Sequence, residues 1–236
     1  MAVIVRNMQV VHSDIVAAAR KAGRDPAEIR LLAVSKSFGA DAVIEAAQAG
    51  QHAFGENYLQ EALDKMTAVR AAQPTICSTL EWHFIGPIQS NKTRPIAEHF
   101  DWVHSIEREK IAQRLSQQRP ADLPPLNVCL QVNISGEASK SGVPAEQAPA
   151  LAHAIAALPG LRLRGLMAIP EPAATFEQQS EPFRKVRLLF ERLRAEGLAL
   201  DCLSMGMSAD MAAAIAEGAT MVRIGTAIFG ERNYDK

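Results

Sequence analysis

The chain has 236 residues, of which 48% are hydrophobic and 22% charged, and its 25 basic and 26 acidic side chains leave a formal net charge of −1. This balance gives no electrostatic basis for binding nucleic acid or an anionic membrane, and no segment approaches the length of a membrane span. The length fits one large α/β barrel or two small domains.

Cysteine usage and the start of the chain bear on the compartment. Cys77, Cys129 and Cys202 are far apart and lack metal-ligand spacing, which favours reduced, mostly buried thiols in a cytosolic protein. Residues 1–23 contain no long apolar core and no evident cleavage site. We therefore expect a cytoplasmic protein without a metal site.

The first expected element is an amphipathic helix near the N-terminus. Its apolar residues recur at helical spacing, and they are Val3, Met8, Val11, Ile15, Val16 and Ala19.

Short apolar runs then alternate with longer helical stretches. The eight runs expected to form strands cover residues 30–36, 52–57, 81–86, 102–107, 126–135, 161–169, 201–206 and 221–230. Strict alternation of strand and helix implies a parallel sheet. Eight such units in this length predict an α/β fold, a single (β/α)8 TIM-type barrel over residues 1–236 with an extra N-terminal helix. An open doubly wound sheet is the alternative.

Glycines and polar segments mark the connections. Gly50, Gly197 and Gly218 stand where three helices should end, as expected of C′ glycines. The most flexible segments should be residues 135–144 and 170–182. Both follow strands, on the side where a barrel places its site.

The sequence has no GxGxxG, P-loop, HExxH or CxxC motif, so the candidate site comes from strand ends. A barrel often binds phosphate between the loops after its last two strands. There, Ser208 could cap a helix beginning near Ala209, while Gly225 and Thr226 offer close backbone approach and a hydroxyl. Asp210 argues mildly against a phosphate unless it faces away. Taken singly, Ser208 could be only a helix cap and Gly225 only a bend.

Lys36 and Arg223 indicate which other chemical groups a phosphate-containing ligand would have. Lys36 ends the first strand, which neighbours the eighth strand in a closed barrel, and Arg223 faces the same way as Gly225. A lone lysine at a strand end is usually just solvated. Beside a cation and a phosphate cup, it could instead form a Schiff base with a phosphorylated aldehyde. Pyridoxal 5′-phosphate (PLP) fits all three groups, and a phosphosugar bound by an aldolase fits two of them.

Longer motifs carry a family resemblance. They are "LLAVSK", "FGENYLQE", "WHFIGPIQSNK", "VNISGEASKSG", "GLMAI" and "LSMGMSADMAAAIAEGATMVRIGTAIFG". Together they resemble the pyridoxal phosphate homeostasis protein family (YggS/PROSC type). That family is similar to the barrel domain of fold-type III PLP enzymes such as alanine racemase.

The resemblance implies PLP as cofactor and six cofactor-binding residues. The expected set is Lys36 as internal aldimine, Ser208, Gly225 and Thr226 at the phosphate, Arg223 at the pyridine nitrogen, and Asn57 as a further pocket residue.

The resemblance also implies a non-enzymatic protein that carries, buffers or regulates intracellular PLP, and so affects vitamin B6, amino-acid and keto-acid balance. The alternative is a fold-type III amino-acid racemase with weak activity. Racemization needs a second positioned base, and the resemblance implies that racemases of this fold use a tyrosine for it. The only tyrosines in this sequence are Tyr58 and Tyr234, and neither is an obvious candidate. We therefore expect no catalytic residue, a monomer, and PLP-dependent apo-enzymes as candidate recipients.

Five more positions carry an expectation. His83 lies in an apolar strand and should be a satisfied core histidine. Gln89, Asn91 and Lys92 could line the rim or solvate a helix start. Lys140, on an expected mobile loop, is a hypothetical second and transient contact for PLP.

Overall fold

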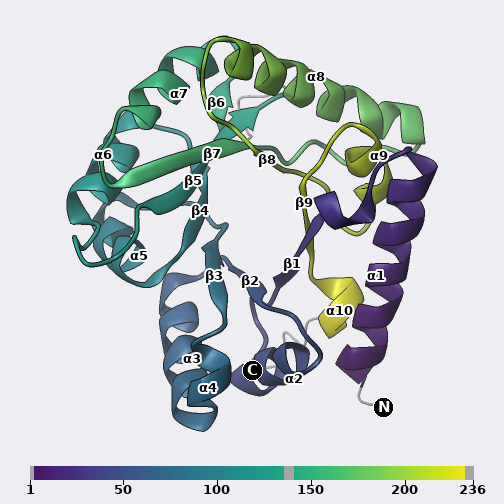
Figure 1. Cartoon of the computed structure of the whole chain (residues 1–236), viewed down its shortest axis with the longest axis vertical. Helices are drawn as coiled ribbons and strands as arrows, with labels where there is room; N and C mark the ends of the chain where they lie inside the picture. Colours follow the sequence, from purple (N-terminus) through teal and green to yellow (C-terminus); the bar gives the residue numbers. More distant parts are fainter. Residues whose placement is uncertain (1–2, 136–140, 232–236) are drawn as a thin grey trace.

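The fold is a closed parallel β-barrel surrounded by helices (Figure 1). The computed structural model describes residues 3–135 and 141–231. The barrel strands are β1 (Arg30–Val34), β2 (Ala53–Glu56), β3 (Glu81–Phe84), β4 (Trp102–Ile106), β5 (Leu126–Asn133), β7 (Leu161–Met167), β8 (Cys202–Ser204) and β9 (Met221–Ile224). Each pairs in parallel with the next, and the β4–β5 and β9–β1 pairings complete the ring. This confirms the eight-stranded barrel, because an open sheet would have two unpaired edges.

Helices follow the strands and cover the outside of the barrel (Figure 1). They are α1 (Val3–Lys21), α2 (Ala40–Gln48), α3 (Leu59–Ala72), α4 (Pro74–Cys77), α5 (Thr93–His99), α6 (Glu109–Gln118), α7 (Ala148–Ala156), α8 (Phe176–Ala195), α9 (Met211–Ala216) and α10 (Thr226–Phe229). Two short 3-10 turns, η1 (Pro26–Glu28) and η2 (Ser90–Lys92), precede β1 and α5. Across the two described ranges, every helix is too short or too polar to cross a membrane.

The helix α1 matches the expected N-terminal helix. Met8, Val11, Ile15 and Ala19 are buried, and the helix packs against α2, α9 and α10. Val3 belongs to the helix but is 73% exposed, whereas Ile4 beside it packs against the core.

Three glycines end helices as predicted. Gly50, Gly197 and Gly218 follow α2, α8 and α9 with φ angles of 95°, 97° and 96°. In this left-handed region a side chain is disfavoured.

Every barrel strand is shorter than its predicted range, and the difference is largest for the last two strands. The strand β9 ends at Ile224, and residues 226–229 form α10, because the chain turns at Gly225 (φ −117°, ψ −75°). The strand β8 contains only residues 202–204. The apolar run past Ile224 has the composition of a strand, but it folds as a short helix.

The segments expected to be flexible contain secondary structure. Residues 143–144 form β6 (Val143–Pro144), which pairs with β5 alone, and residues 136–140 lie outside the described residues. The helix α8 begins within the second segment, at Phe176. Its start is fixed by a capping box in which Thr175 and Gln178 exchange hydrogen bonds.

The barrel interior contains an apolar cluster. It consists of Leu32, Ala53, Trp102, Cys129, Met167, Cys202 and Met221. Cys129 and Cys202 are buried thiols whose Sγ atoms lie 3.9 Å apart, and Cys77 is half-buried. The expectation of free, mostly buried cysteines is confirmed.

Candidate ligand-binding site

A pocket of about 330 Å3 opens at the C-terminal ends of the strands. It is lined by Val34, Lys36, Phe38, Asn57, Ile85, Ile169, Met207, Ser208, Ala209, Arg223, Gly225 and Thr226. The six residues that the resemblance assigns to PLP all line it. The barrel brings them together because the C-terminal ends of parallel strands meet at one rim.

The turn that carries Lys36 is fixed at both of its neighbours. Ser35 N–H donates to Gly55 O at 3.0 Å, and Lys65 Nζ donates to Ser35 O at 2.8 Å. Ser37 has φ +69°, a left-handed conformation that is costly for a residue with a side chain. Its N–H donates to Glu61 Oε1 at 2.6 Å, which holds that conformation. The side chain of Lys36, half-buried, thereby reaches the pocket.

A buried ion pair lies behind this turn. Lys65 Nζ contacts Glu56 Oε1 at 2.6 Å and Glu61 Oε1 at 3.1 Å, and the Lys65 and Glu56 side chains are 3% and 0% exposed. Ser35 Oγ donates to Glu56 at 2.6 Å. Burial raises the pKa of Glu56, although Lys65 and Ser35 oppose the shift. We call Ser35, Glu56, Glu61 and Lys65 the lysine-turn cluster.

Arg223 lies on β9 at the floor of the pocket and is only 4% exposed. Its Nη1 donates to Ser204 O at 2.6 Å and to Ser204 Oγ at 2.8 Å, and its Nη2 donates to Ala168 O at 3.0 Å. Burial lowers the pKa of Arg223 to about 10, although Asp210 opposes the shift, so the guanidinium stays charged near neutral pH. Three of its five N–H groups are thus held by fixed acceptors.

The three residues of the expected phosphate cup, Ser208, Gly225 and Thr226, all line the pocket, but one expectation about them is wrong. Ser208 is not a helix cap: α9 begins at Met211 and its N-cap residue is Asp210. Asp210 Oδ1 accepts a hydrogen bond from Met207 N–H at 2.6 Å, which closes a turn over residues 207–210 and postpones the helix. Asp210 is not among the pocket-lining residues, so its carboxylate does not face a ligand there. Thr226 begins α10, whose first N–H groups lack intrahelical acceptors.

Asn57 follows β2 and carries an unpaired polar atom. Its Oδ1 is buried without a hydrogen-bond partner among the described residues. Gly86, after β3, allows the β2 end to come this close, because a Cβ at residue 86 would lie 2.8 Å from Asn57 Cα. A buried acceptor without a partner is costly unless a ligand donates to it.

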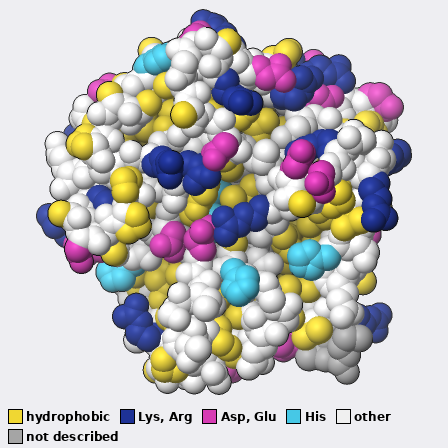
Figure 2. Space-filling model, viewed as in Figure 1, with side chains coloured by type: hydrophobic (Ala, Val, Ile, Leu, Met, Phe, Trp, Pro, Cys, Tyr) yellow, Lys and Arg dark blue, Asp and Glu magenta, His cyan; other side chains and the backbone are white. Residues whose placement is uncertain are grey.

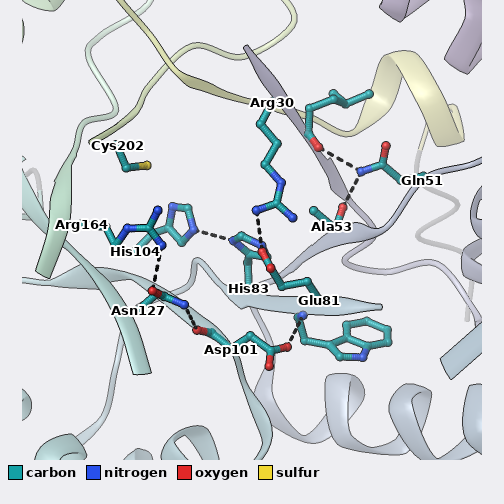
Figure 3. A network of polar contacts seen from close by, with 12 residues as sticks. Arg30, Gln51, Ala53, Glu81, His83, Asp101, His104, Asn127, Arg164 and Cys202 are labelled. Carbon is teal, nitrogen blue, oxygen red and sulfur yellow. Dashed lines mark hydrogen bonds and ion pairs between the residues drawn. The ribbon is translucent and has the colours of Figure 1, made fainter. Parts of the chain in front are cut away.

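A chain of four polar side chains lies beneath Arg223, and only His83 was considered in the sequence. Starting from Ser204, it continues through His104 and His83 to Glu81 (Figure 3 shows its last three members). His83 is fully buried and hydrogen-bonded, as predicted. We call these four residues the histidine chain. Alternation could have signalled part of it, because Glu81 and His83, like Trp102 and His104, are two residues apart and so face one side of the sheet.

The protonation of the histidine chain follows from its burial. Burial lowers the pKa of His83 to about 4, although Glu81 opposes the shift. Burial and the charges of His83 and Arg223 place the pKa of His104 well below its usual value. Burial alone would raise the pKa of Glu81, but His83 and Arg30 lower it to about 2. Near neutral pH, both imidazoles are neutral and Glu81 is a carboxylate.

Other candidate residues lie elsewhere. Gln89, Asn91 and Lys92 are exposed at the 3-10 turn before α5 and do not line the pocket. Tyr58 is the N-cap residue of α3 and is 56% exposed. Lys140 and Tyr234 lie outside the described residues.

The apolar lining of the pocket was not predicted. It comprises Val34, Phe38, Ile85, Ile169 and Met207. Such residues suit a flat organic ring between polar contacts. An apolar residue at a strand end carries no sequence signal of its own, because most such residues are simply core.

Known proteins resemble this chain over nearly its whole length. The alanine racemase N-terminal domain family matches residues 11–233. The pyridoxal phosphate homeostasis protein of Pseudomonas aeruginosa is 63% identical over 234 residues, 99% of this chain and 98% of that relative. The protein of the same name from Escherichia coli K12 is 56% identical over 233 residues, with 99% and 98% covered.

Solved structures of known proteins are also similar to this chain. PipY of Synechococcus elongatus PCC7942, solved with PLP bound, is 34% identical, with a TM-score of 0.82 over 96% of this chain and all of that one. Alanine racemase of Corynebacterium glutamicum is 18% identical, with a TM-score of 0.67 over 99% of this chain and 62% of that one, a likeness of fold. On these grounds the chain belongs to the pyridoxal phosphate homeostasis protein family, whose barrel is that of the alanine racemase N-terminal domain.

Proposed function

We propose that this protein binds PLP in the pocket and carries, buffers or regulates it, without catalysing a reaction of its own. Lys36 would hold PLP covalently, because a lysine amine can condense with an aldehyde and release water. Ser208, Gly225 and Thr226 would bind the phosphate, Arg223 the pyridine nitrogen, and Asn57 a further polar group. Relatives at 50–63% identity are named for PLP homeostasis, and PipY binds PLP.

One observation carries the proposal: a lysine, an arginine and the backbone turns at Ser208 and Gly225 line one mostly apolar pocket. These three features match the aldehyde, ring nitrogen and phosphate of PLP. The buried, unpaired Oδ1 of Asn57 is a further sign that the pocket is completed by a ligand.

The same pocket supports a role other than racemization. Among the described residues that line it, Lys36 and Arg223 are the ionisable side chains. Moving a proton between two faces of a substrate needs a second base. Arg223, charged and able only to donate, would also keep the ring nitrogen unprotonated and weaken the ring as an electron sink. The monomeric state and the delivery of PLP to apo-enzymes remain predictions.

Titration with PLP tests the proposal. The wild-type protein should turn yellow with an absorption band near that of a PLP Schiff base, and Lys36→Ala should not. Lys92→Ala is the control, because Lys92 is exposed on the same barrel but away from the pocket. A band that survives in Lys36→Ala, or exchange of amino-acid α-protons well above that given by free PLP, would contradict the proposal.

A further inference from the structure

The histidine chain connects the two ends of the barrel. At one end, Arg30 Nη1 pairs with Glu81 Oε1 at 2.8 Å, where the strands begin. Glu81 then contacts His83 Nε2 at 2.7 Å, His83 Nδ1 contacts His104 Nε2 at 2.8 Å, and His104 Nδ1 contacts Ser204 Oγ at 2.8 Å. The Arg223 contact with Ser204 Oγ, also 2.8 Å, closes the chain at the pocket.

The chain is sealed in its middle and accessible at its first end. His83, His104 and Ser204 are fully buried, and the ring of Trp102 stacks on His83 at 5.3 Å. The Arg30 and Glu81 side chains are 41% and 31% exposed. Figure 2 shows acidic and basic side chains gathered over the centre of the barrel on the face in view. The chain therefore links an exposed charge pair to the floor of the ligand pocket.

The chemistry of the groups permits one direction of hydrogen bonding. Glu81, as a carboxylate, only accepts, so His83 Nε2 must carry a proton and donate to it. A neutral His83 then has a bare Nδ1, to which His104 Nε2–H donates (Figure 3). His104 Nδ1 is bare in turn and accepts the hydroxyl proton of Ser204.

The direction matters at Arg223. Because the hydroxyl proton of Ser204 is committed to His104, the Oγ lone pair faces Arg223 Nη1. A guanidinium only donates, so the N–H of Arg223 meets a free acceptor on Ser204 Oγ and not a second donor. In the reverse direction, His104 would donate to Ser204 Oγ, and the hydroxyl proton would compete with Arg223 for the acceptors around it.

We propose that Glu81, His83, His104 and Ser204 are positioning residues, which set one hydrogen-bond direction through the barrel and thereby hold the Arg223 guanidinium in place at the pocket floor. The consequence for ligand binding rests on the proposed function, in which Arg223 faces the ring nitrogen of PLP. Nothing but Arg223 at the end of the chain needs to touch the ligand.

Nitrogen NMR of the histidine side chains tests the direction without any ligand. In the 15N-labelled wild-type protein, His83 and His104 should both be neutral Nε2–H tautomers near neutral pH. Glu81→Gln should yield mixed tautomers, because an amide both donates and accepts and no longer imposes a direction. Glu217→Gln is the matched control, since that carboxylate is paired with arginines on α8, away from the barrel interior. An Nδ1–H tautomer at either histidine in the wild type would overturn the inference.

Loss of PLP tests the consequence. Glu81→Gln should lose PLP to a trap faster, on the order of five-fold, and Glu217→Gln at the wild-type rate. If Glu81→Gln does not fold, two variants of His104 test the positioning role instead. His104→Gln keeps one acceptor and one donor, and it should retain PLP better than His104→Leu. Mixed tautomers with an unchanged rate, or equal rates for the two His104 variants, would refute the positioning role. If the wild type forms no Schiff base on Lys36, the proposed function fails, while the tautomers still decide the direction.

Discussion

Two polar networks support the pocket, one behind the turn that carries Lys36 and one beneath Arg223, and they are built differently. The lysine-turn cluster is short and charged, and it holds backbone atoms: the carbonyl of Ser35 and the N–H of Ser37, on either side of Lys36. The histidine chain is long and mostly neutral, and it holds one side chain, that of Arg223.

The difference follows from what each group must do. A lysine that forms a covalent bond needs a mobile side chain on a fixed backbone. An arginine that fixes a ring must itself be fixed along its whole length. We therefore expect the cluster to contribute more to stability and the chain more to the retention of PLP.

Removing the buried ammonium should give the largest loss of stability. Lys65→Met leaves the Glu56 carboxylate buried without its cation, which should lower the free energy of unfolding by about 3–5 kcal/mol. Urea denaturation measures it. The double variant Lys65→Met/Glu56→Gln should recover part of the loss, because no charge is left buried. Lys185→Met, in an exposed pair with Glu181, should leave the midpoint unchanged. A loss for Lys65→Met no larger than that control would contradict the role of the cluster.

Acid should act mainly on the histidine chain. The folded pKa of His83, about 4, lies below the unfolded value of about 6.5. As the pH falls from about 6.5 to about 4, His83 binds a proton in the unfolded chain but stays neutral in the folded protein. The free energy of unfolding therefore decreases over this range. His83 alone should contribute about 2–3 kcal/mol between pH 7 and pH 4, and His104 shifts the same way.

The control for the acid effect is the variant His83→Gln/His104→Gln, measured by urea denaturation at several pH values. Its stability should depend less steeply on pH over the same window. If the slope is the same as in the wild type, the acid sensitivity belongs to other groups.

Breaking the histidine chain at its centre should cost less at neutral pH than breaking the cluster. His104→Leu leaves the hydroxyl proton of Ser204 without an acceptor and His83 Nδ1 without a donor, which should lower the free energy of unfolding by about 2 kcal/mol. His104→Gln should lose less, because its amide can satisfy both groups. Thermal unfolding followed by circular dichroism can rank the two variants, and a less stable Gln variant would count against this arrangement.

The smallest effect concerns the turn itself. Ser37 is exposed and has φ +69°, so Ser37→Gly should relieve left-handed strain in the folded state. The greater conformational freedom of glycine in the unfolded chain should offset part of that gain. The net gain should be about 0.5 kcal/mol, whereas Ser37→Val should be destabilising because a β-branched residue resists this conformation. Chemical denaturation of both variants distinguishes the signs, and a destabilised Gly variant would mean that φ is not the constraint.

The barrel could be predicted because its signal is repeated. Eight apolar runs separated by helical stretches, with C′ glycines at residues 50, 197 and 218, allow few other folds. The ends of the elements were predicted less accurately, because strand, turn and helix compete there locally. The run after Gly225 is apolar enough to extend a strand, yet it forms α10. The helix after Ser208 begins later than expected, because Asp210 closes a turn first.

The position of the candidate site follows from topology, and its supports do not. Once β1 and β9 are neighbours, Lys36 and Arg223 must end near one rim. The histidine chain depends on which side chains meet inside the ring, such as His104 on β4 and Ser204 on β8, 100 residues apart. The Glu56–Lys65 pair depends on how α3 packs against β2. No single-sequence pattern specifies either contact.

The attachment site of PLP tests the central claim most directly. The protein is saturated with PLP, reduced with borohydride, digested, and mapped by mass spectrometry. We predict a pyridoxyl group on Lys36 at close to one per chain. A label on another lysine, or an unlabelled Lys36 in protein that retains PLP, would contradict the account.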